Sequence, residues 1–249
     1  MTTKTETKAF FSGQAKDYSS VIQYDSYVDV RKVSLVHEYI QKSDKVLDIG
    51  CADGLHLIDF SASCGAITGV DMNPDMLEAS RNNIKGKKLK NCKLVEGSAE
   101  DLPLEDESFD LAFSYSTLVV VDDVAKALAE AFRVLKKGGI GVFDITGRYN
   151  LSFLHWRKHY SEKCNHEING FSLSQARRLL KETGFQIQAE EAIGFTDQWR
   201  YIPLLHKTTF LAKVFHDGSG EPDLDARISG FVGIRCLANR WFFVVRKPF

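Results

Sequence analysis

Two groups of residues in the N-terminal half have the types and spacing of a ligand site. Residues 46–54 read VLDIGCADG, a short apolar run followed by a turn with glycines at positions 50 and 54, and a second apolar run ends at Asp71, seventeen residues after Gly54. Glycine lets a turn pass close to a ligand because no Cβ intervenes. In α/β nucleotide sites, a carboxylate at the tip of the second strand holds the two ribose hydroxyls. The pattern therefore predicts a site for a nucleoside-bearing cofactor.

The spacing of the glycines argues against a dinucleotide. A dinucleotide fingerprint is G-x-G-x-x-G, whereas this turn is G-x-x-x-G, with Ala52 in the middle and Asp53 inside it. A carboxylate would repel a pyrophosphate but is tolerated beside an ammonium or sulfonium group. The chain here resembles the class I S-adenosylmethionine-dependent methyltransferases, in particular the broad small-molecule, methyltransferase type 11-like group. Their first motif is roughly D-x-G-C-G-x-G, from which Ala52 departs, and the cofactor that this resemblance implies is S-adenosylmethionine.

The resemblance covers about residues 18–195 and the last strand, and it implies roles for single residues. Asp71 would hold the ribose and Met72 would cover one face of the adenine. Either Glu100 or Asp101 would face the exocyclic amine of the adenine. The residues expected at the cofactor are Tyr18, Arg31, Asp48, Gly50, Cys51, Ala52, Gly54, Asp71, Met72, Ser98, Ala99, Glu100 and Ser114.

Two of these residues lie ahead of the first strand. In many family members a Tyr and an Arg from an N-terminal helix reach the carboxylate of the cofactor, and here they would be Tyr18 and Arg31. A guanidinium suits that task because it pairs with a carboxylate through two hydrogen bonds. The alternative is that Arg31 lies on the solvent face of a helix over residues 28–41, whose apolar residues have helical spacing.

The elements that must position these residues follow the pattern of a doubly wound α/β fold. Between residues 45 and 144, short apolar runs alternate with helical segments, which is typical of a mostly parallel sheet. Residues 136–139 are expected to form a helix C-cap and turn, and residues 186–193 and 241–246 are expected to be the last two strands. The resemblance implies a seven-stranded Rossmann-like sheet whose last strand is antiparallel and lies beside the fifth.

Two insertions extend this core. Residues 147–170 follow the fifth strand, and residues 196–239 separate the sixth strand from the seventh. Long insertions in compact domains are usually functional or disordered, and ligands of open α/β sheets bind at the carboxyl ends of the strands. The resemblance implies that residues 1–44 form a helical lid over the cofactor. Residues 45–249 are expected to form the methyltransferase core, with both insertions as a helical cap over the substrate and Trp199 or Tyr201 within reach of the acceptor.

The motifs do not assign a general base. Many family members place a His shortly after the fourth strand, but residues 118–121 are LVVV in this chain. The catalytic candidates are Tyr115, which leaves the fourth strand on the substrate side, and His155 and His159 in the first insertion. A lone exposed His is usually a solvated surface residue. The other histidines of the cap segments stay open as candidates, namely His166, His206 and His216.

Composition and charge restrict the classes of function. The chain of 249 residues has a formal net charge of −1 and an isoelectric point of about 6.7, so no global basic surface recruits nucleic acid. Its five scattered cysteines lack C-x-x-C spacing, which argues for a reducing compartment and against a metal site. No apolar run approaches the length of a membrane span, and the N-terminus lacks the apolar core of a signal peptide. We expect a cytoplasmic protein without a transmembrane segment, and a homodimer is left open.

These features favour an S-adenosylmethionine-dependent methyltransferase that acts on a small-molecule acceptor by in-line transfer to oxygen or nitrogen. Methyl transfer from a sulfonium requires mainly positioning and a dry pocket, because the methyl group is already activated. The sequence does not specify the acceptor. The alternative is a cofactor-binding module of the same fold, whose insertion at residues 196–239 serves as a partner or membrane-surface element.

Overall fold

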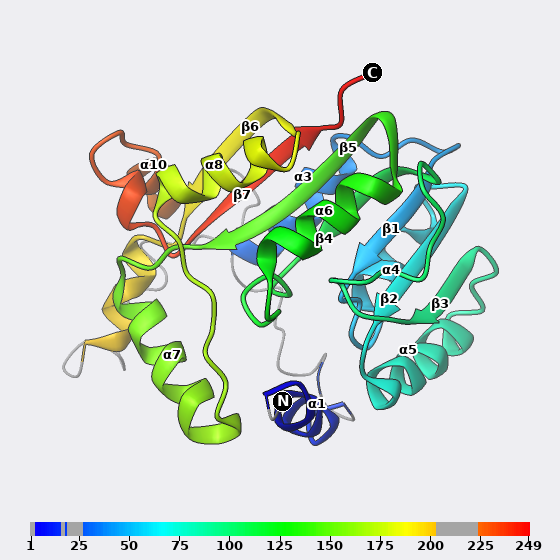
Figure 1. Ribbon diagram of the computed structural model, residues 1–249, viewed down its shortest axis with the longest axis horizontal. Helices are drawn as coiled ribbons and strands as arrows, with labels where there is room; N and C mark the ends of the chain where they lie inside the picture. The colour runs from blue at the N-terminus through cyan, green and yellow to red at the C-terminus, as the bar shows by residue number, and fades with distance from the viewer. Residues whose placement is uncertain (1–2, 16–17, 19–26, 203–223) are drawn as a thin grey trace.

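The structure is a computed structural model that describes residues 3–15, 18, 27–202 and 224–249 (Figure 1). Within these residues, seven strands form one sheet with the order β3-β2-β1-β4-β5-β7-β6. The strands β1 to β5 pair in parallel, whereas β7 runs antiparallel to both β5 and β6. The predicted fold class, a mostly parallel sheet with an antiparallel last strand and covering helices, is confirmed.

In the inner strands β1, β2, β4, β5 and β7, consecutive residues are buried on both faces of the sheet, as expected for a sheet covered by helices, whereas the edge strands β3 and β6 are only partly buried. In β7, Trp241 and Phe243 belong to the apolar core on one face, and Phe242 belongs to the core on the other face. This strand therefore ties the two cores together. The strands are β1 (Lys45–Ile49), β2 (Ala66–Asp71), β3 (Cys92–Glu96), β4 (Phe109–Ser114), β5 (Leu135–Thr146), β6 (Gln186–Ile193) and β7 (Arg240–Arg246).

Helices cover both faces of the sheet. Those in the described residues are α1 (Thr3–Ser12), α3 (Tyr27–His37), α4 (Leu55–Ser61), α5 (Pro74–Gly86), α6 (Val124–Val134), α7 (Leu151–Cys164), α8 (Leu173–Glu182) and α10 (Leu224–Ser229), with short 3-10 helices η1 (Thr196–Tyr201) and η2 (Arg235–Leu237). The core on one face contains residues of α6 and α8, and the core on the other contains residues of α3, α4 and α5. Side-chain N-caps start four of these helices, at Asn73, Asp123, Asn150 and Ser172.

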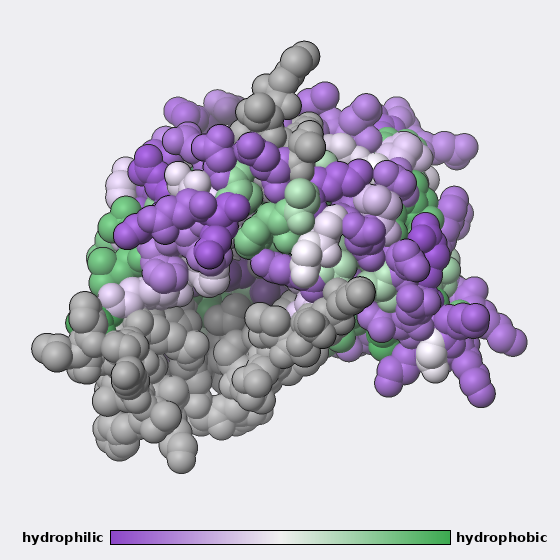
Figure 2. All heavy atoms as spheres, turned by 90° about the horizontal axis from the view of Figure 1, so that it is seen from below, coloured by the Kyte–Doolittle hydropathy of each residue, from purple (hydrophilic) through white to green (hydrophobic). Residues whose placement is uncertain are grey.

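Two helices, α1 and α7, lie off the sheet on the lower side of Figure 1. Helix α1 packs on both α5 and α7. The ring of Phe10 in α1 contacts the rings of His159 and Tyr160 in α7. The N-terminal helix is thus held by side chains of α7, which lies about 150 residues later in the chain. Seen from below in Figure 2, the surface is mainly hydrophilic, with apolar patches at its left edge and near its centre.

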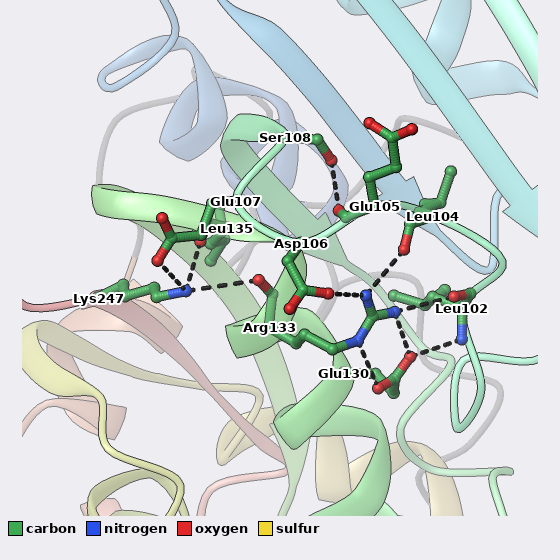
Figure 3. A network of polar contacts seen from close by, with 10 residues as sticks. All are labelled: Leu102, Leu104, Glu105, Asp106, Glu107, Ser108, Glu130, Arg133, Leu135 and Lys247. Atoms are coloured by element: carbon green, nitrogen blue, oxygen red, sulfur yellow. Dashed lines mark hydrogen bonds and ion pairs between the residues drawn. The ribbon is translucent and has the colours of Figure 1, made fainter.

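A polar network holds the segment after β3 against α6 (Figure 3). The guanidinium of Arg133 donates to the carbonyls of Leu102 and Leu104 at 2.9 and 2.8 Å. Glu130 accepts the N–H of Leu102 at 2.8 Å and pairs with Arg133 at 2.7 Å. The neighbouring guanidinium lowers the pKa of Glu130. Since residues 98–100 belong to the start of the same segment, the network positions them relative to the sheet.

Strand β5 begins earlier than the sequence predicts. Residues 136–139 are expected to form a helix cap and turn, but they belong to β5, which starts at Leu135 directly after α6. The N–H of Gly138 donates to the carbonyl of Lys247 at 2.9 Å, and the N–H of Lys247 donates to the carbonyl of Gly139 at 2.9 Å. Pairing with the C-terminal segment extends the strand, and this long-range contact leaves no trace in the local pattern.

Candidate active site

The carboxyl ends of β1 to β4 meet at one edge of the sheet, and a cavity lies against them. The cavity has about 880 Å³ of empty space, including its mouth. Ligands of open α/β sheets bind at this edge. Three parts of the chain line it: the N-terminal segment, the turns after β1 to β4, and the end of the first insertion. The residues that line the cavity include Lys8, Phe11, Tyr18, Gly50, Ala52, Asp71, Met72, Asn73, Met76, Ser98, Ala99, Glu100, Tyr115, Ser116, Thr117, Val120, Val121, Asp122 and His166.

The turn after β1 is held against the end of β2. The N–H groups of Gly50 and Cys51 donate to the carbonyl of Val70 at 2.8 and 3.0 Å. Gly50 has a φ of 81°, and a Cβ there would lie 2.0 Å from Oγ1 of Thr117. Ala52 has a φ of 46°, in the left-handed region, which costs a non-glycine residue about 1–2 kcal/mol. The turn is therefore a backbone cradle at the cavity that is packed against Thr117, and a side chain at position 50 would displace that residue.

Two backbone N–H groups orient Asp71 at the tip of β2. One carboxylate oxygen accepts the N–H of Ala52 at 2.9 Å, and the other accepts the N–H of Asn73 at 2.8 Å. Burial raises the pKa of Asp71, while these N–H groups act in the opposite sense. Each carboxylate oxygen has a second lone pair with which to accept a hydroxyl. Asp71 and the adjacent Met72 both line the cavity, where the sequence places the ribose and the adenine.

Asp48 is buried behind the same turn and is 2% exposed. Its Oδ2 atom has no hydrogen-bond partner among the described residues. Burial, together with the nearby charge of Asp71, raises the pKa of Asp48 well above its ordinary value. A buried carboxylate of this kind is stabilised by a cation. Asp48 does not itself line the cavity, so it would act on the ammonium group of a cofactor such as S-adenosylmethionine only through its charge, from behind the turn.

The segment after β3 lines the cavity with Ser98, Ala99 and Glu100. Glu100 is buried, its side chain accepts the N–H of Asp123 at 2.7 Å, and its own N–H donates to Ser98 Oγ at 3.2 Å. Asp101, the other carboxylate expected near the exocyclic amine, is exposed. Of these two residues, the structure brings Glu100 to the cavity.

The N-terminal segment forms a further wall. Lys8 and Phe11 of α1 line the cavity together with Tyr18, and burial raises the pKa of Tyr18. Helix α1 is attached to the start of α5, because Asn73 Nδ2 donates to the carbonyl of Lys8 at 3.0 Å. The described part of residues 1–44 thus reaches the cavity at these positions.

The structure does not bring Arg31 to the cavity. Its Nε donates to Glu191 Oε2 of β6 at 2.7 Å, and the guanidinium also pairs with Glu38. Both carboxylates raise the pKa of Arg31. The sequence leaves open whether Arg31 reaches the cofactor or the helix surface. The structure places it in an ion-pair network between α3 and β6, because two acidic side chains outside the cavity lining take up its charge.

Three other residues predicted at the cofactor support the turn without lining the cavity. Ser114 Oγ donates to the carbonyl of Ile49 at 2.9 Å, which ties β4 to the end of β1. Cys51 is buried in the core on the α4 side of the sheet. Gly54 has a φ of 81°, and its N–H donates to the carbonyl of Cys51 at 2.9 Å at the start of α4.

The catalytic candidates from the sequence are engaged elsewhere. The hydroxyl of Tyr115, which does line the cavity, donates to the carbonyl of Lys32 at 2.8 Å, and burial raises its pKa well above the ordinary value. His155 is exposed and packs its ring against Tyr201. His159 is half-buried and packs between aromatic rings of α1 and α7. Neither histidine lines the cavity, since α7 directs both of them outward or towards α1.

His166, one of the histidines that the sequence leaves open, does line the cavity. It is 3% exposed, and neither ring nitrogen has a hydrogen-bond partner among the described residues. His206 and His216 lie outside the described residues.

The described part of the second insertion packs on the end of β6 and on α7. Asp225 of α10 is buried and accepts the N–H groups of Gly194 and Thr196 at 2.7 Å, so α10 closes over the end of β6. The hydroxyl of Tyr201 accepts a hydrogen bond from Trp156 Nε1 of α7 at 3.2 Å. No described residue of 196–239 lines the cavity, and the side chain of Trp199 lies outside the described part. The substrate cap in this insertion stays a prediction.

Several cavity residues carry no signal in the sequence. Val120 and Val121 follow β4 where the sequence suggests core packing, and Phe11 and Lys8 belong to a helix far from any motif. The sequence contains one indication of this wall, namely the polar residues that begin the segment after β4. Among them, Thr117 lies against the turn at Gly50.

The described residues contain no group of three or more His, Cys, Asp or Glu side chains that could hold a metal ion. Nor do they contain a helix with the length and apolarity to cross a membrane.

Comparisons with known proteins agree with this geometry. Residues 47–143 match the family described as a methyltransferase domain. The demethylmenaquinone methyltransferase of Listeria welshimeri is 35% identical over 124 residues, which are 49% of this chain and 52% of that protein. The demethylmenaquinone methyltransferase of Staphylococcus aureus is 34% identical over 145 residues, 56% of this chain and 59% of that protein. The chain thus spans little more than half the length of these curated relatives.

Solved structures share the fold. An S-adenosylmethionine-dependent methyltransferase from Thermotoga maritima superposes with a TM-score of 0.64 at 20% identity, over 96% of this chain and 99% of that chain. Phosphoethanolamine N-methyltransferase 2 of Haemonchus contortus, solved with S-adenosyl-L-methionine, has a TM-score of 0.62 at 24% identity, over 88% of this chain and 52% of that chain.

Proposed function

We propose that this chain, a class I S-adenosylmethionine-dependent methyltransferase by family and fold, methylates a small-molecule acceptor in the cavity at the strand ends. The observation that carries the proposal is the convergence of two unlike sets of residues on one cavity. The ends of β1 to β3 supply the glycine cradle and oriented carboxylates, while α1 and the segment after β4 supply apolar walls.

The first set would hold the cofactor. Asp71 would accept the ribose hydroxyls, Met72 would cover the adenine, and Glu100 would face its exocyclic amine. Asp48, buried behind the turn, would stabilise the ammonium group through its negative charge. Bound S-adenosylmethionine supplies an activated methyl group whose departure leaves a neutral thioether. The chain itself supplies positioning and exclusion of water.

The second set would hold the acceptor. Phe11, Val120 and Val121 give this part of the cavity apolar walls, which suit a flat, weakly polar ring. The relatives named demethylmenaquinone methyltransferases support an acceptor of the quinone type. We propose oxygen or nitrogen as the accepting atom, and the carbon-13 chemical shift of a labelled methyl group in the product distinguishes either from a carbon.

The test is binding followed by turnover. Calorimetry with S-adenosylhomocysteine should show one site, and methyl-labelled S-adenosylmethionine should label an acceptor in a panel of hydroquinones, catechols and aromatic amines. Binding of S-adenosylhomocysteine without turnover on any acceptor would contradict the enzymatic proposal. That result would favour the alternative, a cofactor-binding module whose insertion at residues 196–239 contacts a partner or a membrane surface.

A further inference from the structure

His166 has the surroundings of a ligand-binding imidazole. It is buried at the cavity wall, and neither ring nitrogen has a hydrogen-bond partner among the described residues. A buried donor or acceptor without a partner destabilises a fold, and core histidines are usually satisfied by neighbouring polar groups. The ring is therefore better explained by a polar group of a ligand than by packing.

The segment that carries His166 is fixed at both ends. Asn165 caps α7 with a left-handed φ of 48°, which reverses the chain at the helix end. Asn169 holds the other end, because its N–H donates to the carbonyl of Val119 at 2.8 Å and its Nδ2 donates to that of Val121 at 2.6 Å. His166 is thus attached to the wall that follows β4, whereas the residues expected at the cofactor follow β1 to β3.

We propose that His166 is the general base that removes a hydroxyl proton from the acceptor, and that the acceptor is therefore a phenol or hydroquinone. This inference rests on the proposed function. The proton passes from the acceptor oxygen to a ring nitrogen of neutral His166, and the electron pair left on the acceptor forms the bond to the methyl group. The thioether departs with the electron pair of the broken carbon–sulfur bond, and the imidazolium then returns its proton to solvent.

The chemistry of the surroundings agrees with this class of acceptor. A neutral imidazole accepts a proton near neutral pH, and a phenol is acidic enough to donate one. The titratable groups that share the cavity with His166 are Lys8 and Tyr18 from the N-terminal segment, Asp71 and Glu100 at the strand ends, and Tyr115 and Asp122 after β4. The Tyr115 hydroxyl is already bonded to the carbonyl of Lys32, so the imidazole is the better base.

The first experiment compares three variants. His166→Gln keeps a polar side chain without a usable proton acceptor, His166→Phe keeps an aromatic shape, and Glu167→Gln changes the exposed neighbour on the same segment. With a naphthohydroquinone as acceptor, both His166 variants should lose about 100-fold or more in kcat, the usual contribution of a general base. They should bind S-adenosylhomocysteine as the wild type does, and Glu167→Gln should match the wild type in both assays.

The pH profile separates a base from a structural residue. In the wild type, kcat/KM should show a limb that rises with pH, as general-base catalysis requires, and in His166→Gln that limb should vanish. Urea unfolding of each variant shows whether the fold is kept. If His166→Gln folds and retains activity and the rising limb, or if His155→Gln removes them instead, the assignment is overturned.

A second readout does not depend on turnover. Para-nitrophenol, whose absorbance distinguishes phenol from phenolate, is titrated into the complex with S-adenosylhomocysteine. Binding to the wild type should convert the probe towards phenolate at neutral pH, and His166→Phe should abolish that conversion. Phenolate formation that is equal in both proteins would refute the role of His166. A wild type that ionises the probe but methylates no acceptor would instead contradict the proposed function.

Discussion

The most direct test of the site geometry is Gly50→Ala. Gly50 combines a φ of 81° with a Cβ position that lies 2.0 Å from Thr117 Oγ1, 2.6 Å from Cγ2 and 2.8 Å from Cβ. Rotation of the threonine side chain cannot remove all three contacts, because its own Cβ is among them. The added methyl group must therefore displace the turn after β1 or the segment after β4, and both line the cavity.

The expected magnitude follows from these contacts. The left-handed backbone costs an alanine about 1–2 kcal/mol, and overpacking of a filled site costs about 1–3 kcal/mol. The total cost of about 2–5 kcal/mol lowers the free energy of unfolding if the turn keeps its position. If the turn shifts instead, the same cost lowers the affinity for the cofactor. In the second case, even the lower figure corresponds to a loss of about 30-fold in affinity for S-adenosylhomocysteine.

The assay is calorimetry with S-adenosylhomocysteine alongside urea unfolding, with Gly86→Ala as the matched control. Gly86 ends α5, and a Cβ there meets no atom within 4 Å, so alanine should be neutral or stabilise the protein by up to about 1 kcal/mol. Adding Thr117→Gly to Gly50→Ala removes all three crowded atoms. The double variant should therefore recover the part of the stability or affinity that the contact with Thr117 cost, but not the part that the backbone conformation cost.

Two results would refute this reasoning. One is a Gly50→Ala protein that matches Gly86→Ala in both affinity and unfolding midpoint. The other is a double variant that recovers nothing, since the contact with Thr117 would then be irrelevant to the loss.

Three further predictions concern the carboxylates. Asp71→Ala should weaken S-adenosylhomocysteine binding about tenfold or more, because the variant loses charged hydrogen bonds to two ribose hydroxyls. Unchanged calorimetric affinity in a folded variant would show that Asp71 does not bind the ribose. Asp48→Asn should make the ligand-free protein more stable to urea at pH 7, because the raised pKa of Asp48 means that wild-type stability falls as pH rises. The gain in stability should shrink on acidification. The variant should also bind S-adenosylhomocysteine more weakly. Glu130→Gln should destabilise the protein by about 1–3 kcal/mol at pH 7. Because Arg133 lowers the pKa of Glu130, urea titrations should show that difference disappearing as pH falls through the acidic range, and a pH-independent difference would contradict the pairing.

The insertions show where sequence patterns reach their limit. The sequence predicts a cap from their length and places catalytic histidines at positions 155 and 159 in the first one. In the structure, the residue of that insertion at the cavity is His166, because the left-handed cap at Asn165 and the hydrogen bonds of Asn169 turn the segment after α7 inward. A helical pattern specifies which residues share a face, but not which neighbour that face meets.

What the sequence determined by itself is the half of the site that local structure builds. A buried strand, a glycine turn and a helix follow one another within about 25 residues. Parallel strands place their carboxyl ends at one edge, so Gly50 and Asp71 had to meet. The tertiary structure alone decided the other half. It brought Phe11 and His166 to the cavity and drew Arg31 away to Glu191. Those contacts join segments about 50 to 160 residues apart, and they depend on how helices pack across the sheet edge rather than on the order of residues within any one element.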